Sequence, residues 1–575
     1  MIEKKLPVNM NQSFYNSMGI RMLTKLSRLT QTAWHLKATQ FWYMGLYRVL
    51  PQRYRSLHIP FEDKLVLRKN IRCRIKFVPP IPYYDNIVSD TGEFTFLHKT
   101  VHMNWPPDWE KANKEERLWC YNLHYHDYIW GLSFEKAKIL VESWIDSCSF
   151  RQGAASWRPY PISVRLCNWL KYFFCTNAKR CQTEFDFTEK LIKSVATQAG
   201  WLLKNIELHL LGNHLFENAV ALYLVGACFD GSLAETCTER GLDLLKHELD
   251  EQILSDGGHF ERSPMYHCRF LYLLADLYNF GIDNMIPQIE DCLVRMWSWL
   301  QLMCHPDGQT ALFNDSAHNI YLSPVALSEY LSRLLDRASP HPLGAFGLSD
   351  SGYFGWIVSD DEYIVCDAGP VGPDYQPGHA HSDIFSFELS LNGRRMIVDS
   401  GTSTYSSGPE RQYLRSTAAH NTVEINGRNQ VDVWGSFRVG RRVKPQDVRF
   451  TPSLDGFELS AWHDGYKHNS GLRHRRTFAY RKKHNLRITD EFQGIANQNI
   501  RTRLHFAPDC IIKIADSCCV IKNGSVSLQI TFDGYTSPHI EKTHVSFDLG
   551  GSVNAQCLIL SLRDKETIGN IFVSW

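Results

Sequence analysis

The spacing of apolar residues changes once along the chain, near Gly344, and this change limits the fold more than any other feature. From about residue 20 to 340, apolar residues recur every three or four positions, as at Leu166, Trp169 and Leu170. That spacing is typical of helices that bury one face. After Gly344, short runs alternate apolar and polar residues and end at Gly, Asn, Asp or Pro, which is typical of strands. We therefore expect an all-helical part followed by an all-β part.

The same patterns divide the 575 residues into three units. More than one unit is expected, because a chain of this length is too long to fold around a single hydrophobic core. Residues 1–120 predict an irregular and helical segment. Residues 121–340 predict helices joined by short turns, as in a toroid or a solenoid, and the absence of a fixed repeat disfavours the repeat families. Residues 345–575 predict an antiparallel β-sandwich or super-sandwich. The nine predicted strands are Tyr353–Val358, Tyr363–Asp367, Phe385–Leu391, Arg395–Val398, Thr422–Ile425, Thr477–Tyr480, Leu486–Thr489, Ser527–Phe532 and Cys557–Leu562.

Charge balance, the length of apolar runs and the distribution of cysteines limit which partners and which cellular compartment are expected. Lys and Arg number 62 and Asp and Glu 61, which argues against nucleic acid or an anionic membrane as the main partner, although a local basic cleft could be hidden in this average. No apolar run approaches 18 residues, so we expect no membrane span. Met1–Leu50 contains no secretory apolar core and the 16 cysteines are scattered, so we expect the cytoplasm, with the periplasm as the alternative.

Two polar segments in the helical half are candidates for chemistry. In Gly212–Asn218, Asn213 and His214 stand together at the expected start of a helix. Asn213 could simply cap that helix, because its side chain can accept from free backbone N–H groups. In Gly257–His267, Tyr266 is flanked by Glu, Arg and His and is a candidate general acid or base.

Two further segments in the β half contain candidate metal ligands. His379 and His381 lie directly before a predicted strand, and Asp399 follows the next one. His420 also precedes a strand and could supply another ligand. Two imidazoles with a nearby carboxylate suit Zn²⁺ or a similar ion. The alternative is a set of hydrogen-bonded polar residues that hold no ion.

Taken together, these segments resemble the heparinase II/III family of polysaccharide lyases. The resemblance rests on the stretches GHAHSDIFSFELSLNGRRMIVDSGTSTY and RQYLRSTAAHNTVEINGRNQ in the β half and on GNHLFENAVAL and GGHFERSPMYH in the helical half. WCYNLHYHDYIWGL and WRPYPISVRLCNWLKY further resemble members that are encoded among surface-polysaccharide genes. The specific motifs cover residues 110–450.

The resemblance implies an α+β multidomain protein, in which an N-terminal (α/α) toroid precedes a C-terminal antiparallel β super-sandwich. It also implies β-elimination at a uronic acid residue of an acidic polysaccharide. Such an enzyme must neutralise the uronate carboxylate, remove the C5 proton and protonate the leaving oxygen at C4. Donors placed at the developing charge usually contribute most, and proton transfer adds about 10²–10⁴-fold.

Roles for individual residues follow from the same resemblance. Asn213 would hydrogen-bond the uronate carboxylate, and His214 would assist it or act on the proton. Tyr266 would be the base, the acid or both, and His379 would complete the catalytic group from the β half. His381, Asp399 and His420 match the structural metal site of the family, which makes Zn²⁺ the expected cofactor. The further candidates for substrate binding are Glu261, Arg269 and Tyr405.

Two other functions remain open at this point. The chain could be a sugar-binding or assembly protein of polysaccharide biosynthesis that keeps the fold without cleaving. It could also be a glycoside hydrolase, which would need two opposed carboxylates. Glu217, Glu261 and Asp315 are available in the helical half, but none forms a convincing pair by sequence.

Overall fold

The computed structural model describes residues 22–23, 25–49, 65–82, 87–89, 91–112, 114–148, 154–358, 361–494, 498–515, 518–536 and 538–575. The prediction for residues 1–120 therefore lies partly outside the described residues, as does part of the Met1–Leu50 segment searched for a leader. No helix in the described ranges is both long enough and apolar enough to cross a bilayer.

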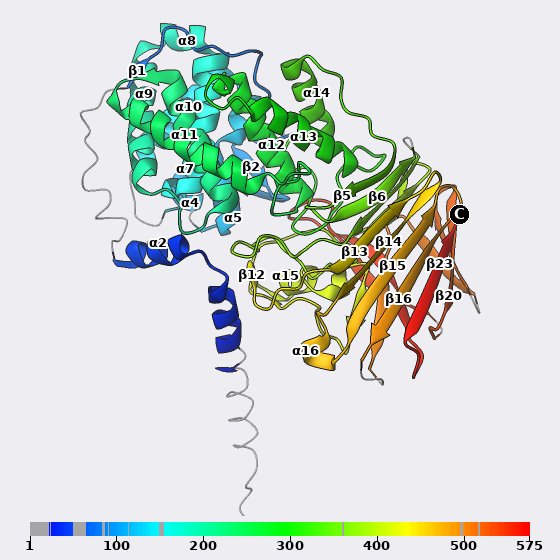
Figure 1. The fold of residues 1–575 in the computed structure, drawn as a ribbon. Coiled ribbons are helices and arrows are strands. Elements are labelled where there is room, and N and C mark those ends of the chain that lie inside the picture. The colour runs from blue at the N-terminus through cyan, green and yellow to red at the C-terminus, as the bar shows by residue number, and fades with distance from the viewer. Residues whose placement is uncertain are drawn as a thin grey trace, which may run out of the picture.

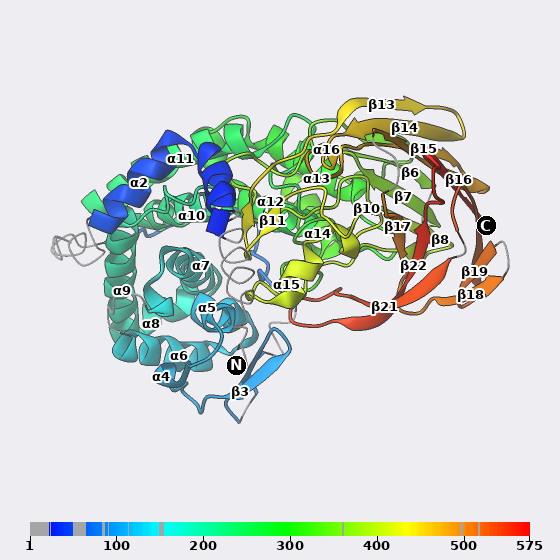
Figure 2. The same cartoon turned by 90° about the horizontal axis from the view of Figure 1, so that it is seen from below.

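The helical half is an (α/α) toroid in which paired helices surround an inner layer (Figures 1 and 2). Within it α10 packs against both α7 and α11, and α12 packs against α13. The α-helices are α4 (Trp109–Ala112), α5 (Arg117–Tyr125), α6 (Phe134–Ser147), α7 (Pro159–Trp169), α8 (Ala178–Thr183), α9 (Phe185–Lys204), α10 (Gly212–Cys228), α11 (Ser232–Gln252), α12 (Pro264–Asn279), α13 (Ile289–Leu302) and α14 (Pro324–Leu335). The short turns η2 (Asp127–Gly131), η3 (Ala155–Trp157) and η5 (Ile282–Asn284) and the π-helical η4 (Leu170–Thr176) complete the half.

Outer and inner helices differ in how much of their surface is apolar. In α9 the buried side chains include Phe187, Leu191 and Val195, which share one helix face because they lie four residues apart. In α12 every side chain is buried, as expected for a helix that other elements cover on all sides. The inner helices therefore bring their polar residues into the interior, where these need specific partners.

Among the described residues of the β half are three larger antiparallel sheets, each with strands labelled in Figure 2. The first has the order β5-β6-β7-β8-β9, the second β10-β17-β22-β21 and the third β13-β14-β15-β16-β23-β20-β19-β18. The strands are β5 (Gly344–Leu348), β6 (Tyr353–Val358), β7 (Glu362–Asp367), β8 (Phe387–Leu391), β9 (Arg394–Ile397), β10 (Val423–Ile425), β13 (Gln446–Pro452), β14 (Gly456–His463), β15 (Arg473–Arg481), β16 (Asn485–Gln493), β17 (Ile500–His505), β18 (Ile511–Ala515), β19 (Cys518–Asn523), β20 (Val526–Asp533), β21 (His539–Val545), β22 (Val553–Ser561) and β23 (Ile568–Ser574).

The predicted fold class is confirmed, since a helical half precedes antiparallel sheets and the change occurs between α14 and β5. Small exceptions occur in both halves. The helical half contains β1 (Val66–Leu67) paired with β4 (Phe229–Asp230), and a hairpin of β2 (Glu93–Phe96) and β3 (Lys99–His102). The β half contains the short helices α15 (Pro409–Leu414), η6 (Thr417–Ala419) and α16 (Lys467–Ser470), and the small ribbon of β11 (Val433–Trp434) and β12 (Arg438–Val439). These elements are too short to carry a periodic pattern.

Candidate active site

Tyr266 lies in the first turn of α12, and the local sequence fixes that turn. The Ser263 hydroxyl accepts a hydrogen bond from the backbone N–H of Tyr266 at 3.3 Å, and Pro264 occupies the start of the helix, where its missing N–H costs nothing. The same hydroxyl donates to the backbone carbonyl of Asp315 at 2.6 Å. The side chain of Tyr266 is thereby held at the face of the toroid that meets the β half.

The hydroxyl and ring of Tyr266 contact two side chains of the β half. Its hydroxyl oxygen lies 3.1 Å from that of Tyr405, and its ring centroid lies 3.9 Å from that of His379. Burial and the neighbouring Tyr405 raise the pKa of Tyr266 well above its ordinary value, so the phenol is protonated at neutral pH. The two halves of the chain therefore contribute to one group of proton-carrying side chains.

Asp315 fixes the orientation of both histidines of the His-Ala-His motif. His379 Nδ1 and His381 Nε2 each lie 2.9 Å from an oxygen of this carboxylate, and Arg411 donates two hydrogen bonds to it. Burial acts to raise the pKa of Asp315, but Arg411 and the two histidines outweigh it and hold that pKa well below its ordinary value. Because an ionised carboxylate only accepts, His379 must donate from Nδ1. Its Nε2 is then the ring nitrogen that faces Glu261, at 3.4 Å.

Glu261 connects this group to the start of α10. Its Oε1 accepts from the backbone N–H of Asn213 at 3.2 Å. Gly212 precedes Asn213 with φ +60°, and a Cβ there would lie 2.9 Å from Glu261 Oε1 and 3.2 Å from Gln376 Cγ. Glycine is therefore needed for this close approach. The side-chain oxygen of Asn213, which can only accept hydrogen bonds, is buried and has no protein partner.

His214 carries a positive charge more readily than an ordinary histidine. Its Nδ1 lies 3.2 Å from Glu207 Oε1, and its ring centroid lies 4.4 Å from that of Tyr160. Burial acts to lower the pKa of His214, but the carboxylates of Glu207, Glu261 and Glu217 outweigh burial and raise it. The start of α10 therefore places an imidazole with a raised pKa next to the side-chain amide of Asn213.

Aromatic rings flank this group on both sides. Tyr321 lies 6.2 Å from Tyr266 between ring centroids, and Tyr160 approaches from α7. On the β side, Phe437 lies 5.5 Å from Tyr405 and is 45% exposed. Rings with polar edges provide flat apolar area and hydrogen bonding together, which is the combination that a sugar ring requires.

The three predicted metal ligands are buried beside this group, although they do not converge on one point. His420 Nδ1 lies 2.9 Å and 3.0 Å from the two oxygens of Asp399, whereas His381 is directed at Asp315. Among the described residues, no group of three or more His, Cys, Asp or Glu has a geometry that could hold an ion. The buried Nδ1 of His381 and Nε2 of His420 nevertheless have no hydrogen-bond partner, and the two ring centroids are 5.3 Å apart. Zinc therefore stays a prediction.

Two of the predicted substrate-binding residues are occupied by protein contacts. Arg269 donates to both oxygens of Glu217, at 2.6 Å and 3.2 Å, and both side chains are buried. Glu261 is 2% exposed and is shared between Asn213 and His379. Tyr405 is half-buried and contacts Tyr266 directly. Substrate binding by these three residues stays a prediction.

The sequence motifs did not single out three of the residues that organise the site. Asp315 was considered only as a hydrolase carboxylate, whereas it orients both histidines. The motifs assign no role to Arg411 or Glu207. In the structure Arg411 donates hydrogen bonds to the Asp315 carboxylate, and the Glu207 carboxylate lies beside the His214 imidazole. The polar run Asn314-Asp315-Ser316 inside an apolar segment is the feature that could have indicated the first of these.

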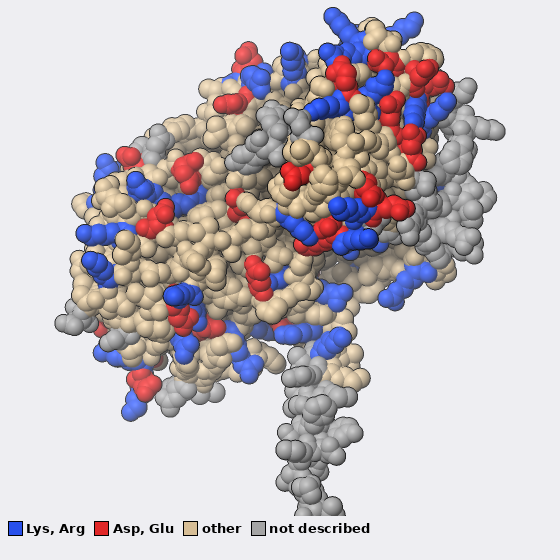
Figure 3. Space-filling model, turned by 180° about the vertical axis from the view of Figure 1, so that it is seen from behind, with Lys and Arg blue, Asp and Glu red and all other residues tan. Residues whose placement is uncertain are grey.

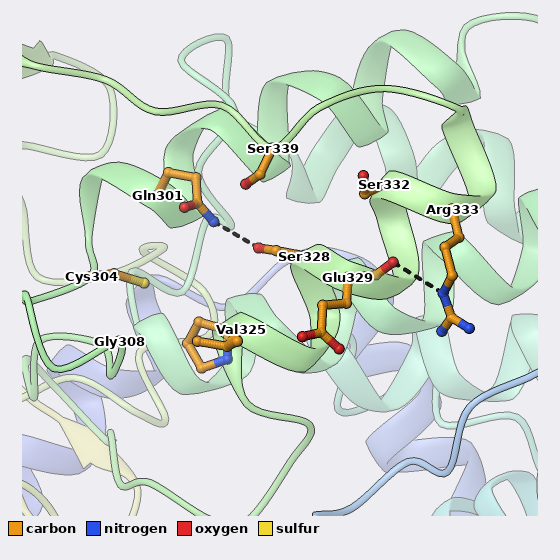
Figure 4. Close-up of a pocket in the computed structure, with 10 residues that line it drawn as sticks. Gln301, Cys304, Gly308, Val325, Ser328, Glu329, Ser332, Arg333 and Ser339 are labelled. Atoms are coloured by element: carbon orange, nitrogen blue, oxygen red, sulfur yellow. Dashed lines mark hydrogen bonds between the residues drawn. The ribbon is translucent and has the colours of Figure 1, made fainter.

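A separate hollow of about 720 Å³ lies between the end of α13 and α14 (Figure 4). Gln301, Ser328 and Glu329 line it, and Gln301 donates to Ser328 at 2.8 Å. None of the predicted site residues lines this hollow.

Comparison with known proteins identifies two matching family models. The model described as "Heparinase II/III N-terminus" matches residues 109–332, and the model described as "Heparinase II/III-like, C-terminal" matches residues 340–574. Together they span the toroid and the β half described above. Among solved structures, one named "Crystal Structure of Heparinase III" aligns with a TM-score of 0.66 and 16% identity over 87% of each chain.

Among characterised relatives, the chain is similar to a heparin-sulfate lyase of Bacteroides stercoris, with 27% identity over 309 residues. That alignment covers 48% of this chain and 44% of the relative, so the chain spans less than half of that lyase. It is also similar to the FtsZ-localized protein C of Caulobacter vibrioides, with 26% identity over 404 residues and 66% of each chain covered.

Proposed function

The chain belongs to the heparinase II/III family, and we propose that it is a polysaccharide lyase that cleaves uronic-acid-containing chains by β-elimination. One observation carries the proposal. The Tyr266 hydroxyl, the Tyr405 hydroxyl and the His379 imidazole meet at the junction of the two halves, so proton carriers lie together where a chain could bind. Similarity to heparin-sulfate lyases supports the same activity class.

Neutralisation of the uronate carboxylate is assigned to the start of α10. The Nδ2 of Asn213 can donate a hydrogen bond to the carboxylate, and the raised pKa of His214 favours an imidazolium next to it. Charge that develops on the carboxylate as C5 loses its proton would then meet donors that are already in place. Such preorganised donors usually supply the largest share of the rate enhancement.

Proton transfer is assigned to His379 and Tyr266. The Nδ1 of His379 donates to Asp315, so in the neutral imidazole Nε2 is the nitrogen whose lone pair can accept the C5 proton. Tyr266 is protonated and can give its proton to the O4 leaving oxygen. Tyr405 can then hydrogen-bond the Tyr266 oxygen across 3.1 Å.

Two of the three carboxylates considered for a hydrolase are bound within the protein, which argues against a hydrolase pair. Glu217 is bound through both oxygens to Arg269, and Asp315 is bound to Arg411 and two histidines. Neither is free to act as the base that activates water in an inverting glycosidase or as the nucleophile of a retaining one.

A screen of uronic-acid polymers, followed by the absorbance of the unsaturated product, tests the proposal. We expect absorbance to grow with at least one polymer, because elimination leaves a C4–C5 double bond. New reducing ends without absorbance would indicate hydrolysis instead. Binding without any new chain end would indicate a sugar-binding protein, and either result would overturn the lyase assignment.

The charge of His214 predicts how activity depends on pH. The pKa of His214 lies above its ordinary value, so we expect kcat/KM to fall as pH rises through that raised pKa and the imidazolium is lost. The His214→Gln variant should have lower activity and lack this limb of the profile. His247→Gln is the matched control, because His247 also pairs with a glutamate, Glu248, but is 65% exposed. An unchanged profile in His214→Gln would remove His214 from carboxylate binding.

A structural metal site formed by His381, Asp399 and His420 is a second part of this proposal. Two buried ring nitrogens in this set lack partners, and a bound divalent ion would satisfy them while tying three segments together beside the catalytic group. Another buried set offers a contrast: His463, His474 and Asp490 are joined by hydrogen bonds of 3.1 Å and 2.8 Å. That set needs no ion.

We expect elemental analysis to find about one divalent ion per chain, lost in His420→Ala and kept in His463→Ala. His379→Ala should also keep the ion, because His381 is the residue assigned to it. Protein that contains no metal, with the same thermal stability in chelator as without it, would favour the alternative of hydrogen-bonded polar residues.

A further inference from the structure

Two helices near the N-terminus join the toroid to the β half. Residues 25–34 form the first, and α2 (Ala38–Val49) the second. They lie on the outside of the molecule, in blue in Figures 1 and 2. The first is bound to the β half by Arg28, which donates to Asp432 at 2.7 Å and 3.0 Å. The second contacts the toroid through Tyr47, which donates to the backbone carbonyl of Ile206 at 2.6 Å.

These helices also contact the loop that leads to His379. Lys37, between the two helices, pairs with Glu251 at 2.6 Å and lies 4.0 Å from the ring centroid of Tyr375. The buried side chain of Gln40 reaches the backbone carbonyl of Tyr375 at 3.5 Å. The inner face of the helix pair is therefore anchored, and its position is tied to that of the candidate active site.

The outer face of the pair is apolar to an unusual degree. Trp34 is 85% exposed, Trp42 69% and Val49 77%. Single exposed apolar residues are normal, but a concentration of large ones on one short segment marks an interaction surface. The other large apolar side chains exposed on these helices are Leu26, Leu29, Phe41 and Met44, and Met22 and Leu23, which precede this segment, are exposed as well.

The charge of this segment has one sign. Residues 4–61 contain nine Lys and Arg and no Asp or Glu, so the rest of the chain is acidic on balance and the net charge of +1 hides the asymmetry. Within the two helices Lys25 and Arg48 are exposed. Elsewhere, as on the face shown in Figure 3, charges of both signs are interspersed.

We propose that the helices of residues 25–49 dock on an anionic lipid surface. Helices that combine Lys and Arg with exposed Trp, Phe and Leu and carry no acidic residue suit the plane of a bilayer interface. An acidic polysaccharide would match the charge but not the exposed Leu, Met and Val side chains. Two copies of the chain that met through this surface would bring like charges together, so a second copy is disfavoured.

Flotation of the full chain with vesicles tests this docking. We expect binding to vesicles of mixed phosphatidylglycerol and phosphatidylcholine and little binding to phosphatidylcholine alone. The double variant Trp34→Ser with Trp42→Ser should lose about tenfold or more of this affinity, and Lys25→Ser with Arg48→Ser should lose less. The matched control is Phe185→Ser with Leu454→Ser, which removes side chains that are 73% and 95% exposed elsewhere.

Each other outcome overturns the proposal. Equal binding to both kinds of vesicle would exclude an anionic lipid surface as the specific partner, and full binding by the double tryptophan variant would exclude these helices as the docking surface. Binding to soluble alginate that only the charge variant loses would identify an acidic polysaccharide as the occupant, and self-association lost in the tryptophan variant would identify a second copy. Turnover of a soluble uronan should be unchanged in the tryptophan variant, so a failure here is distinct from a failure of the lyase assignment.

Discussion

Tyr266→Phe is expected to lower turnover of the uronan substrate by about 10²–10⁴-fold, the range of general acid–base catalysis. The substitution removes one hydroxyl and keeps the ring that packs on His379 at 3.9 Å. KM should change little if the ring, rather than the hydroxyl, supports sugar binding. The measurement is single-turnover formation of the unsaturated product, with folding checked by the unfolding midpoint.

Two variants separate proton transfer from a general effect of losing a tyrosine hydroxyl. Tyr405→Phe removes the neighbouring hydroxyl at 3.1 Å and should have a smaller effect, because Tyr266 keeps its own proton. Tyr413→Phe, which loses a 2.8 Å hydrogen bond to Thr543 away from the site, should leave turnover unchanged. Near-full activity in Tyr266→Phe would mean that His214 and His379 transfer the protons.

The order of helices and strands could be predicted because apolar residues recur every three or four positions in helices and at every second position in strands. The strand over Tyr353–Val358 was predicted with the bounds that β6 has, since its apolar residues form one continuous run between turn residues. By contrast, β13 (Gln446–Pro452) was missed, because it is a sheet edge with mostly exposed side chains. The pairing of β1 with β4 could not be predicted either, because Val66 and Asp230 are far apart in the sequence and become neighbours only when the chain folds.

The candidate site could be predicted where residues share a motif and not where they meet through space. Asn213, Tyr266 and His379 stand in polar segments that a buried core would not contain. Arg411 instead lies in the short helix α15, whose sequence gives no reason to expect a buried cation, and its part depends on contact with Asp315. The orientation of His381 toward Asp315 likewise depends on a contact through space, which the motif does not encode.

Asp315→Asn is expected to lower the free energy of unfolding by roughly 3–5 kcal/mol, the usual cost of removing one partner of a buried ion pair. Asp315 and Arg411 are both fully buried, and the variant would leave the Arg411 guanidinium without its counterion. It would also weaken the bond that orients His379. Turnover should therefore fall even under conditions where the variant remains folded.

The cause can be isolated with one double variant and one control, measured by urea unfolding. Asp315→Asn combined with Arg411→Gln should recover part of the lost stability, because no unpaired charge remains buried. Glu290→Gln breaks the exposed pair with Arg337, whose side chains are 41% and 54% exposed, and should cost at most about 1 kcal/mol. A loss in Asp315→Asn no larger than in Glu290→Gln would mean that the Asp315 carboxylate is not what holds the two halves of the site together.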